Sequence, residues 1–549
     1  MKQRKLRINF ESDWHIGSGA GIPGSVDRQI LRDRNGLPYV PAKTLTGILR
    51  DAAEWLAFNN APGCSPDLLK SLFGTQPKTY NADGIDEPAQ KARLSVRPGR
   101  IPRPLCSRLI DDPGLRDALF LVQPHVKVSR KTGRAEDAHL FSLELVRAGI
   151  PLESDVFLDE PTDCDETFLD TVIKAVRRIG GKRRRGAGKC RLEWVEQWSD
   201  PCTLSEKPTN CPTMSNEAWF RIPLKLEALE ALQISRETLG NTVESRDFIP
   251  GYLLLPHVAG SMAPGAGRWI ARGDIQVSNL TPDFEGQAGL PVPMCLFERK
   301  AVDDKKALNL ALRESSQDEP QLRGIREGYV VPRKKNGADP SNPEENPYDL
   351  ILMKTDKSQT LRMHNTIEDA SQRPTEAVGG VYSYAAIARG SKLYGEISFS
   401  RSAAPLFSKE CFSGEVRVGR SKKDDYGRAR LTSGQCEAKQ LNPVAGLVAG
   451  ARSLLVYLES DVLVRDSCLA YSGDPRDLKR AIERELQGVT LSERPGSSGV
   501  IAAVGRARRH DSWHTKWNLP RPSLIALRAG SVYVFGVESG KLCETALQN

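Results

Sequence analysis

Alternating polar and apolar residues open the chain and predict a half-buried strand over residues 4–10. After a glycine-rich turn, a second strand is expected over residues 26–33. Apolar residues then recur at intervals of three and four as far as Leu56, which predicts a helix that begins at Thr44 or just before it. The order strand, loop, strand and helix indicates an open α+β sandwich of the ferredoxin-like kind.

The rest of the first half alternates between irregular and patterned segments. Residues 58–115 are rich in Pro, Gly and Asp and are predicted to be an insertion with little regular structure. Residues 123–135 have the basic composition of a β-hairpin or a flexible arm. A pair of strands is expected at residues 141–146 and 154–158, and an amphipathic helix over residues 168–179.

A basic, glycine-rich segment, here named the first glycine–basic loop, follows that helix at residues 180–189. Its glycines are Gly180, Gly181, Gly186 and Gly188, and its cations are Lys182, Arg183, Arg184, Arg185 and Lys189. Glycines allow backbone N–H groups to approach an anion closely, and the cations make phosphate the natural one. The spacing is not that of a P-loop, so a nucleic-acid backbone is favoured over a nucleotide. A solvated basic turn is the alternative.

The second half repeats this plan imperfectly. An alternating strand is predicted over residues 218–226, and residues 247–256 stand where Tyr39 to Ala42 stood. A second glycine–basic loop over residues 417–431 contains Arg417, Gly419, Arg420, Lys422, Lys423, Gly427 and Arg428. An internal duplication explains both copies. The sequence therefore predicts two tandem ferredoxin-like (RRM-type) domains with glycine-rich basic loops and irregular insertions: residues 1–198, a linker over 199–215, and residues 216–549 with a mobile charged insertion at about 301–360.

Composition narrows the class of protein. A chain of 549 residues is expected to form two to four domains. Lys and Arg number 78 against 69 acids, and the net charge of +9 is concentrated in loops, which favours a polyanionic partner. The 11 cysteines form no CxxC pair, so neither a zinc site nor a disulfide framework is expected. The N-terminus does not resemble a signal peptide and no apolar run matches a membrane span, so a cytoplasmic protein without a membrane partner is expected.

Taken together, these features resemble the RAMP superfamily of CRISPR effector proteins. In the first half the resemblance rests on residues 16–18, 26–27, 32–33, 36–41 and 45–50, on 127–134 with 144–149, and on the first glycine–basic loop. In the second half, residues 275–279, 290–293, Lys300, 364–368, 380–384, 417–430, 517–522 and 529–533 are similar to the large double-RAMP subunit of type III-D complexes. The helix of this family usually opens with Pro-Gly-Ser, whereas this chain has Pro41-Ala42-Lys43.

The resemblance implies a subunit that binds CRISPR guide RNA near its 5′ tag and helps to position target RNA. Its partners would be other RAMP subunits and the large signalling subunit of a type III complex. RNA binding would require no cofactor. Two alternatives stay open: an endoribonuclease of the same superfamily that cuts precursor or target RNA, and a protein-only scaffold with a basic surface.

Candidate site residues follow from the loops and the resemblance. RNA contacts are predicted for Lys43, Arg50, Lys127, Arg130, Lys131, Arg134, Lys182, Arg183, Arg184, Arg185, Lys189, Arg417, Arg420, Lys422, Lys423 and Arg428, with Gly17 and Gly19 shaping the first turn. The arm that contains Lys127 to Arg134 would act as a thumb on the guide–target duplex. Base stacking candidates are Tyr252, Tyr382, Tyr384, Trp513 and Trp517, with burial in a core as the alternative.

A catalytic role is considered for two residues. Asp27 matches the position of the aspartate that, in type III backbone subunits, lies beside the scissile bond of target RNA. A carboxylate there would bind Mg²⁺ or another divalent metal. The alternative is that Asp27 pairs with a nearby cation. His15 has the residue type of a general base, with a structural histidine as the alternative.

Overall fold

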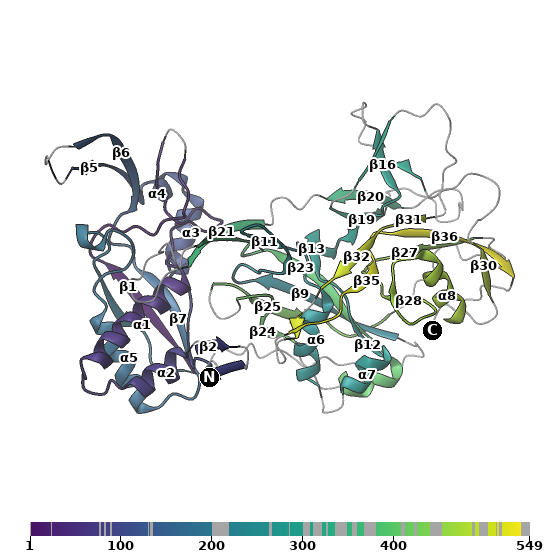
Figure 1. Ribbon diagram of the computed structural model, residues 1–549, viewed down its shortest axis with the longest axis horizontal. Helices are drawn as coiled ribbons and strands as arrows, with labels where there is room; N and C mark the ends of the chain where they lie inside the picture. Colours follow the sequence, from purple (N-terminus) through teal and green to yellow (C-terminus); the bar gives the residue numbers. More distant parts are fainter. Residues whose placement is uncertain are drawn as a thin grey trace.

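The chain forms an elongated molecule with three main hydrophobic cores, which follow one another along its long axis (Figure 1). They comprise residues 6–192, 220–436 and 454–535, and we name the parts around them the N-terminal, central and C-terminal units. The computed structural model describes residues 2–539 except for 23–24, 76–77, 82–83, 88–89, 130, 132–134, 200–218, 263–265, 285, 300–307, 311–320, 326–327, 335–347, 354–358, 367–379, 408–411, 422–424, 440–452, 486–488, 493–502, 512 and 515–518.

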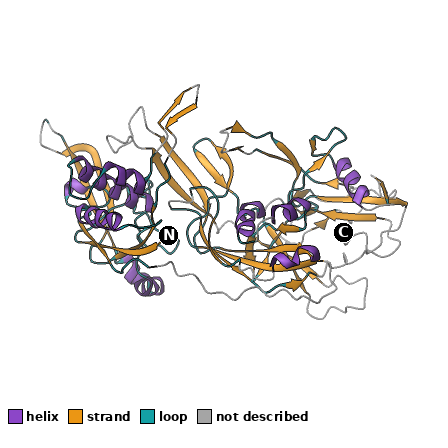
Figure 2. Cartoon of the chain, turned by 90° about the horizontal axis from the view of Figure 1, so that it is seen from below, coloured by secondary structure: helices purple, strands orange, loops and turns teal. Residues whose placement is uncertain are grey.

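The N-terminal unit is built on a four-stranded antiparallel sheet in the order β4-β7-β1-β8. The strands are β1 (Lys2–Phe10), β4 (Leu94–Val96), β7 (Leu152–Leu158) and β8 (Cys190–Trp194). Helices α1 (Ala42–Phe58), α2 (Pro66–Phe73) and α5 (Asp163–Ala175) bury their apolar residues in the same core as the sheet. Figure 2 shows these helices gathered together in this unit. Thr162 and Asp165 form a capping box that fixes the start of α5.

Other elements of the N-terminal unit surround this sheet. They are the β2–β3 pair (Lys78–Asn81, Gly84–Glu87), α3 (Arg103–Asp111), α4 (Pro113–Asp117), the hairpin β5–β6 (Phe120–Val128, Ala135–Val146) and a 3-10 turn, η1 (Arg183–Arg185).

The central unit has a larger sheet whose main path is β14-β13-β23-β9-β25-β24, with β12 paired to β23 and β26 to β9. The strands are β9 (Trp219–Ala228), β12 (Ile275–Val277), β13 (Thr281–Phe284), β14 (Gln287–Ala288), β23 (Lys392–Ser400), β24 (Gly414–Arg417), β25 (Arg428–Ser433) and β26 (Glu437–Ala438). Helices α6 (Gly251–Gly260) and α7 (Ala266–Arg272) and the 3-10 helix η3 (Arg401–Phe407) pack in its core. A second sheet, β10-β11-β22-β21, contains β10 (Ser235–Leu239), β11 (Thr242–Ser245), β21 (Gln359–Thr366) and β22 (Gly380–Ile387).

The C-terminal unit combines short strands with one helix, α8 (Pro475–Glu485). Its strands are β27 (Ser453–Tyr457), β28 (Val464–Arg465), β29 (Tyr471–Ser472), β30 (Thr490–Ser492), β31 (Ala503–Val504), β32 (Ala507–His510), β33 (Trp513–His514), β34 (Leu519–Pro520), β35 (Leu524–Leu527) and β36 (Val532–Ser539). Two three-stranded sheets come from the chain between the central sheet's own strands: β15 (Leu290–Pro291), β19 (Tyr329–Lys334) and β20 (Tyr348–Met353), and β16 (Leu296–Arg299), β17 (Leu308–Asn309) and β18 (Leu322–Gly324).

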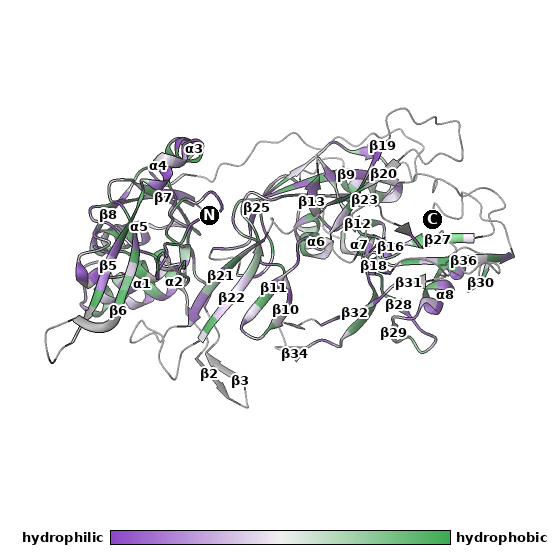
Figure 3. Ribbon diagram, turned by 90° about the horizontal axis from the view of Figure 1, so that it is seen from above, coloured by the Kyte–Doolittle hydropathy of each residue, from purple (hydrophilic) through white to green (hydrophobic). Residues whose placement is uncertain are grey.

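The N-terminal and central units share one hydrogen-bonding plan after their first strands. Four residues beyond the end of β1, Trp14 exchanges backbone hydrogen bonds with Val146, the last residue of the β5–β6 hairpin. Four residues beyond the end of β9, Leu232 does the same with Ile387, the last residue of the β21–β22 hairpin. The two hairpins therefore occupy equivalent places. Figure 3 shows both extending from the same side of the molecule.

The structure confirms an α+β fold with antiparallel sheets and corrects several expectations. Residues 26–33 make only isolated bridges, because the segment crosses the β5–β6 hairpin, where the Ile30 N–H donates to the Glu144 carboxylate. Residues 58–115 are not irregular: they include α2, whose Ser65 side chain caps it, the sheet strand β4, and α3. A three-residue strand is too short for alternation to reveal it.

Other expected boundaries also move. The second helix spans 163–175 and not 168–179, because the capping box at Thr162 starts it earlier. Residues 141–146 and 154–158 are strands, but β6 pairs with β5 and β7 with β1 and β4. Within 301–360 the described residues form β17 to β20 and part of β21, so this insertion contains regular structure. Almost all of the predicted linker at 199–215 lies outside the described residues.

Candidate nucleic-acid interface

The first glycine–basic loop is fastened to the segment that follows β1. The Gly181 N–H donates to the His15 carbonyl (2.7 Å) and the Gly188 N–H to the Asp13 carbonyl (2.8 Å). The Ile179 N–H donates to the Gly188 carbonyl (2.9 Å), which closes the loop at its base. Three successive arginines between these anchors form the turn η1, entered through Lys182 in the left-handed conformation (φ 57°). The loop is thus a fixed backbone structure that presents cations.

The second glycine–basic loop is fastened in the same way. The Arg420 N–H donates to the Gln233 carbonyl (2.8 Å), the Gly427 N–H to Ala231 (2.9 Å) and the Val418 N–H to the Gly427 carbonyl (2.8 Å). Gln233 lies five residues after β9, as His15 lies five after β1.

Both loops need glycine at the same point. Gly180 (φ 98°) and Gly419 (φ 83°) share a backbone conformation that other residues rarely adopt. A Cβ would lie 2.5 Å from the His15 oxygen in the first loop and 2.4 Å from the Gln233 oxygen in the second. Geometry therefore relates the two loops hydrogen bond by hydrogen bond, which supports the predicted duplication.

A basic cluster lies where the first loop meets the β5–β6 hairpin. The Lys182 ammonium lies 5.2 Å from the centre of the Phe141 ring, and the Arg28 guanidinium lies 5.2 Å from the same ring. Burial, and then the charges of Arg28 and Arg185, lower the pKa of Lys182. Burial, Lys182 and Arg185 likewise lower the pKa of His125, whose ring stacks on Phe141. Like charges held together around an aromatic ring favour an anion with flat bases.

Asp27 holds the root of the same hairpin. Its Oδ2 accepts hydrogen bonds from the Ser142 N–H (2.7 Å) and from the Ser142 hydroxyl (3.0 Å). These bonds, aided by Arg28, lower the pKa of Asp27, so the exposed carboxylate is ionised. The described residues contain no group of three or more His, Cys, Asp or Glu side chains that could hold a metal ion. Mg²⁺ at Asp27 would therefore take its further ligands from water and from RNA oxygens.

His15 lies beneath the first loop. Its ring is buried, its Nδ1 is 2.7 Å from the Glu144 carbonyl oxygen, and burial lowers its pKa. A Cβ on Gly17 would lie 3.1 Å from its Nε2, and Gly181 also packs close to the ring. This placement favours the structural role for His15.

Several predicted RNA-contacting cations already have carboxylate partners. Arg50 pairs with Glu54 (2.7 Å), Lys189 with Glu11 (2.8 Å), and Arg428 with Glu415 (2.8 Å). The side chains of Lys131, Arg183, Arg185, Arg417 and Arg420 are exposed, although Arg417 lies close enough to Arg428 for its pKa to be lowered by burial and by that charge. Arg130, Arg134, Lys422 and Lys423 lie outside the described residues, as do the side chains of Lys127 and Arg184.

The stacking candidates are placed differently from one another. Tyr252 is 64% exposed at the start of α6. Tyr382 and Tyr384 instead pack around His364, with ring centroids 5.3 and 5.0 Å from it. The structure describes neither Trp517 nor the side chain of Trp513. Tyr252 is thus the one candidate of the three described side chains that faces solvent freely.

Charged residues outside the predicted RNA contacts join the N-terminal and central units. Arg100 donates to Glu230 (2.6 Å) and lies 3.7 Å from Asp33, and Arg389 also lies 3.7 Å from Asp33. The Ala42 N–H at the start of α1 donates to Asp425, which gives this helix a cap from the second loop. Arg100 and Glu230 are 130 residues apart, and Ala42 and Asp425 are 383 apart, so only the fold brings these partners together.

Comparison with known proteins identifies the first part of the chain. Residues 7–191 match the family model of the RAMP superfamily. This part of the chain is therefore similar to proteins of the RAMP superfamily. The matched range contains the last four residues of β1, the β5–β6 hairpin, the first glycine–basic loop and the first two residues of β8.

The chain also has structural neighbours that align with about a third of its length. A subunit in the cryo-EM structure of type III-B Cmr-beta bound to cognate target RNA aligns with a TM-score of 0.28 and 13% identity, over 35% of this chain and 97% of that one. A chain of apo type III-B Cmr-beta aligns with a TM-score of 0.28 and 14% identity, over 36% and 98%. No curated protein matches the chain. None of the described helices is long and apolar enough to cross a membrane.

Proposed function

We propose that this chain binds the guide RNA of a type III CRISPR effector complex of the III-D kind, near the 5′ tag, and helps to position target RNA. Its partners in this proposal are the guide, the target, other RAMP subunits and the large signalling subunit. The observation that carries the proposal is the pair of glycine–basic loops. Each is fastened to the segment after a first strand by two matching backbone hydrogen bonds and closed at its base by a third.

Two copies of one loop suit an extended polyanion better than a small ligand. Each loop presents exposed arginines, Arg183 and Arg185 in the first and Arg420 in the second. Four N–H groups of the first loop, those of Gly181, Arg185, Gly188 and Lys189, are used within the protein, so side chains supply most of the attraction to phosphate. Such contacts are independent of base sequence, whereas the rings near the β5–β6 hairpin would contact bases. The hairpin itself would serve as the thumb.

The proposal includes a tandem ferredoxin-like organisation. In the N-terminal unit the order β4-β7-β1-β8, with α1 after β1 and α5 after β7, supports it. In the central unit, β12 and β13, β23, β9 and β25 follow the same order, with α6 and α7 after β9. We place one domain at residues 1–198 and the second in 216–549, with the C-terminal core as an addition to it.

The test is RNA binding by the full chain as a function of salt. Arg183→Gln combined with Arg185→Gln removes two exposed charges from the first loop. Affinity for a single-stranded guide-length RNA should fall, and the slope of log K against log salt should flatten by about 1.4, since each phosphate contact to single-stranded RNA contributes about 0.7. Fluorescence anisotropy over a range of salt concentrations measures both.

The matched control is Arg108→Gln with Arg272→Gln, which removes the same net charge from the exposed ends of α3 and α7. Its salt slope should stay close to that of the wild type. Equal slopes for all three proteins would refute the proposal. If RNA copurifies with the chain and is released by extraction, the chain is an RNA-binding protein and not a protein-only scaffold.

Target or precursor cleavage is the second candidate, supported by the ionised Asp27 at the root of the hairpin. The Oδ2 of Asp27 accepts both hydrogen bonds from Ser142. Its Oδ1 would therefore be the oxygen that binds a metal ion held between the protein and RNA. The buried His15 is an unsuitable general base by comparison.

A further inference from the structure

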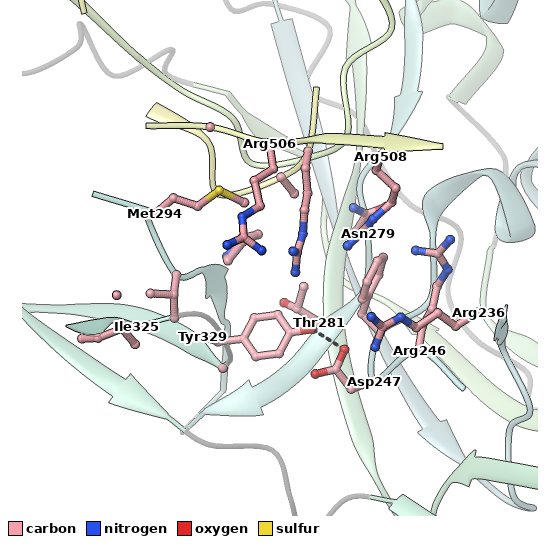
Figure 4. Close-up of a pocket in the computed structure, with 18 of the residues that line it drawn as sticks. Arg236, Arg246, Asp247, Asn279, Thr281, Met294, Ile325, Tyr329, Arg506 and Arg508 are labelled. Carbon is pink, nitrogen blue, oxygen red and sulfur yellow. Dashed lines mark hydrogen bonds between the residues drawn. The ribbon is translucent and has the colours of Figure 1, made fainter. Parts of the chain in front are cut away.

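A cavity lined by arginines lies between the central and C-terminal units, and none of its lining residues belongs to either glycine–basic loop (Figure 4). Its volume is about 700 Å³. Five arginines and one aspartate are the charged residues of its wall: Arg236, Arg246, Arg506, Arg508, Arg528 and Asp247. Figure 4 shows the labelled arginines approaching it from several strands, with Tyr329, Met294 and Ile325 on the opposite side.

Nearby acids do not balance this charge. Arg508 pairs with Asp461 (3.0 Å) and Arg236 with Glu244 (3.7 Å). Among the described residues, no carboxylate lies within ion-pair distance of Arg246, Arg506 or Arg528. The cavity therefore keeps a surplus of positive charge in a partly buried place, which is costly unless an anion offsets it.

Two polar atoms of the wall point to the same need. The Arg246 Nε and the Thr281 Oγ1 are buried and have no hydrogen-bond partner among the described residues. Burial, followed by the charge of Arg508, lowers the pKa of both Arg246 and Arg528. Buried donors are nearly always satisfied in folded proteins, so a ligand with acceptor oxygens fits here.

The other side of the cavity is apolar. Met294, Phe297, Ile325 and Tyr329 line it, and the Tyr329 ring is buried with its hydroxyl donating to Asp247 (3.0 Å). An anion with an attached flat, apolar group would use both sides. A bare inorganic phosphate would use only the arginine side.

We propose that this cavity binds a nucleoside phosphate, with the phosphate among Arg246, Arg506 and Arg528 and the base on the apolar side. The nucleotide is either free or part of an RNA strand, since both carry the same chemistry. The site is separate from the glycine–basic loops and does not rest on the guide-binding proposal.

Binding of small probes to the full chain tests this. AMP represents a free nucleotide, the dinucleotide UpU represents an internal phosphate of RNA, and inorganic phosphate lacks the base. In isothermal titration calorimetry, AMP or UpU should bind more tightly than inorganic phosphate. Binding of AMP without binding of UpU would indicate a site for a free nucleotide. Arg246→Gln combined with Arg506→Gln should weaken the affinity for the bound nucleotide probe by at least about tenfold, because charge-assisted hydrogen bonds are stronger than neutral ones.

Two further proteins keep the test specific. Arg108→Gln with Arg272→Gln matches the charge change and should bind the probe like the wild type. Arg183→Gln with Arg185→Gln should also retain probe binding, even where it loses long RNA. Met294→Ala should reduce the preference for AMP over phosphate without loss of fold. No binding of any probe at millimolar concentration, or equal binding by the cavity variant, would overturn the proposal.

Discussion

Gly188 offers a direct test of how the first glycine–basic loop is held. Gly188 (φ 72°) and Gly186 (φ 94°) are both left-handed, so alanine at either position costs about 1 kcal/mol in backbone strain. At Gly188 a Cβ would also lie 2.0 Å from the Ile179 carbonyl oxygen, whereas at Gly186 nothing lies within 4 Å. The two substitutions therefore share the strain and differ in the clash.

The clash has a cost that can be worked out. Relief requires the base of the loop to open by more than an ångström, which breaks the bonds from Ile179 N–H to Gly188 and from Gly188 N–H to Asp13. At roughly 1 kcal/mol for each bond, Gly188→Ala should lower the free energy of unfolding by about 3 kcal/mol, against about 1 for Gly186→Ala. Urea denaturation followed by the fluorescence of the buried Trp14 measures the difference.

The same pair separates stability from RNA binding. Gly186→Ala should bind RNA almost like the wild type, since the arginines of η1 keep their anchor. Gly188→Ala should bind more weakly even in buffers where it is fully folded. Equal losses of stability and of affinity in both variants would refute the argument that these hydrogen bonds hold the arginines in place.

Three other perturbations test separate parts of the structure. Glu230→Gln removes the charged partner of the largely buried Arg100 and should lower the free energy of unfolding, measured by urea denaturation, by about 3 kcal/mol. A loss below about 1 kcal/mol would show that this ion pair does not hold the two units together. Burial, Lys43 and Arg362 lower the pKa of His364 from 6.5 to about 4, so as the pH drops the unfolded chain takes up this proton before the folded chain does. The melting temperature should therefore fall between pH 6.5 and about 4, and fall less in His364→Gln. A melting temperature that stays constant over this pH range would contradict the argument. If Asp27 cuts RNA, Asp27→Asn should abolish one product of complementary RNA in Mg²⁺ while guide binding persists; an unchanged product ladder would remove Asp27 from catalysis.

Some features could be predicted because residues close together in the sequence determine them. Alternation identified β1 and β9, and the spacing of apolar residues identified α1, which starts at Ala42, just before Thr44. The glycines of the two loops marked the points at which the two backbones are held alike, because the geometry there admits few other residues. A local sequence signal of this kind predicts the structure when the backbone conformation at that position admits only one residue type.

Other features have no local signal. Arg100 and Glu230 are 130 residues apart, and neither belongs to a motif. The cavity arginines are spread from Arg236 to Arg528 and converge only when the C-terminal unit packs beside the central one. Arg428 looked like an RNA contact by composition, yet the fold pairs it with Glu415 and places it 3.8 Å from Asp155 of the N-terminal unit. Composition gives the charge of a residue but not its partner.

The two junctions between units treat charge in opposite ways. At the first, Arg100 and Arg389 face Asp33 and Glu230, so these two cations have carboxylates beside them. At the second, Arg246 directly follows β11 and lines the cavity together with Arg506, Arg508 and Arg528 of the C-terminal unit. A contact that served only to join two units would be destabilised by that repulsion. The surplus at the second junction fits a bound anion, and the paired Arg100 and Arg389 of the first junction supply the comparison within the same chain.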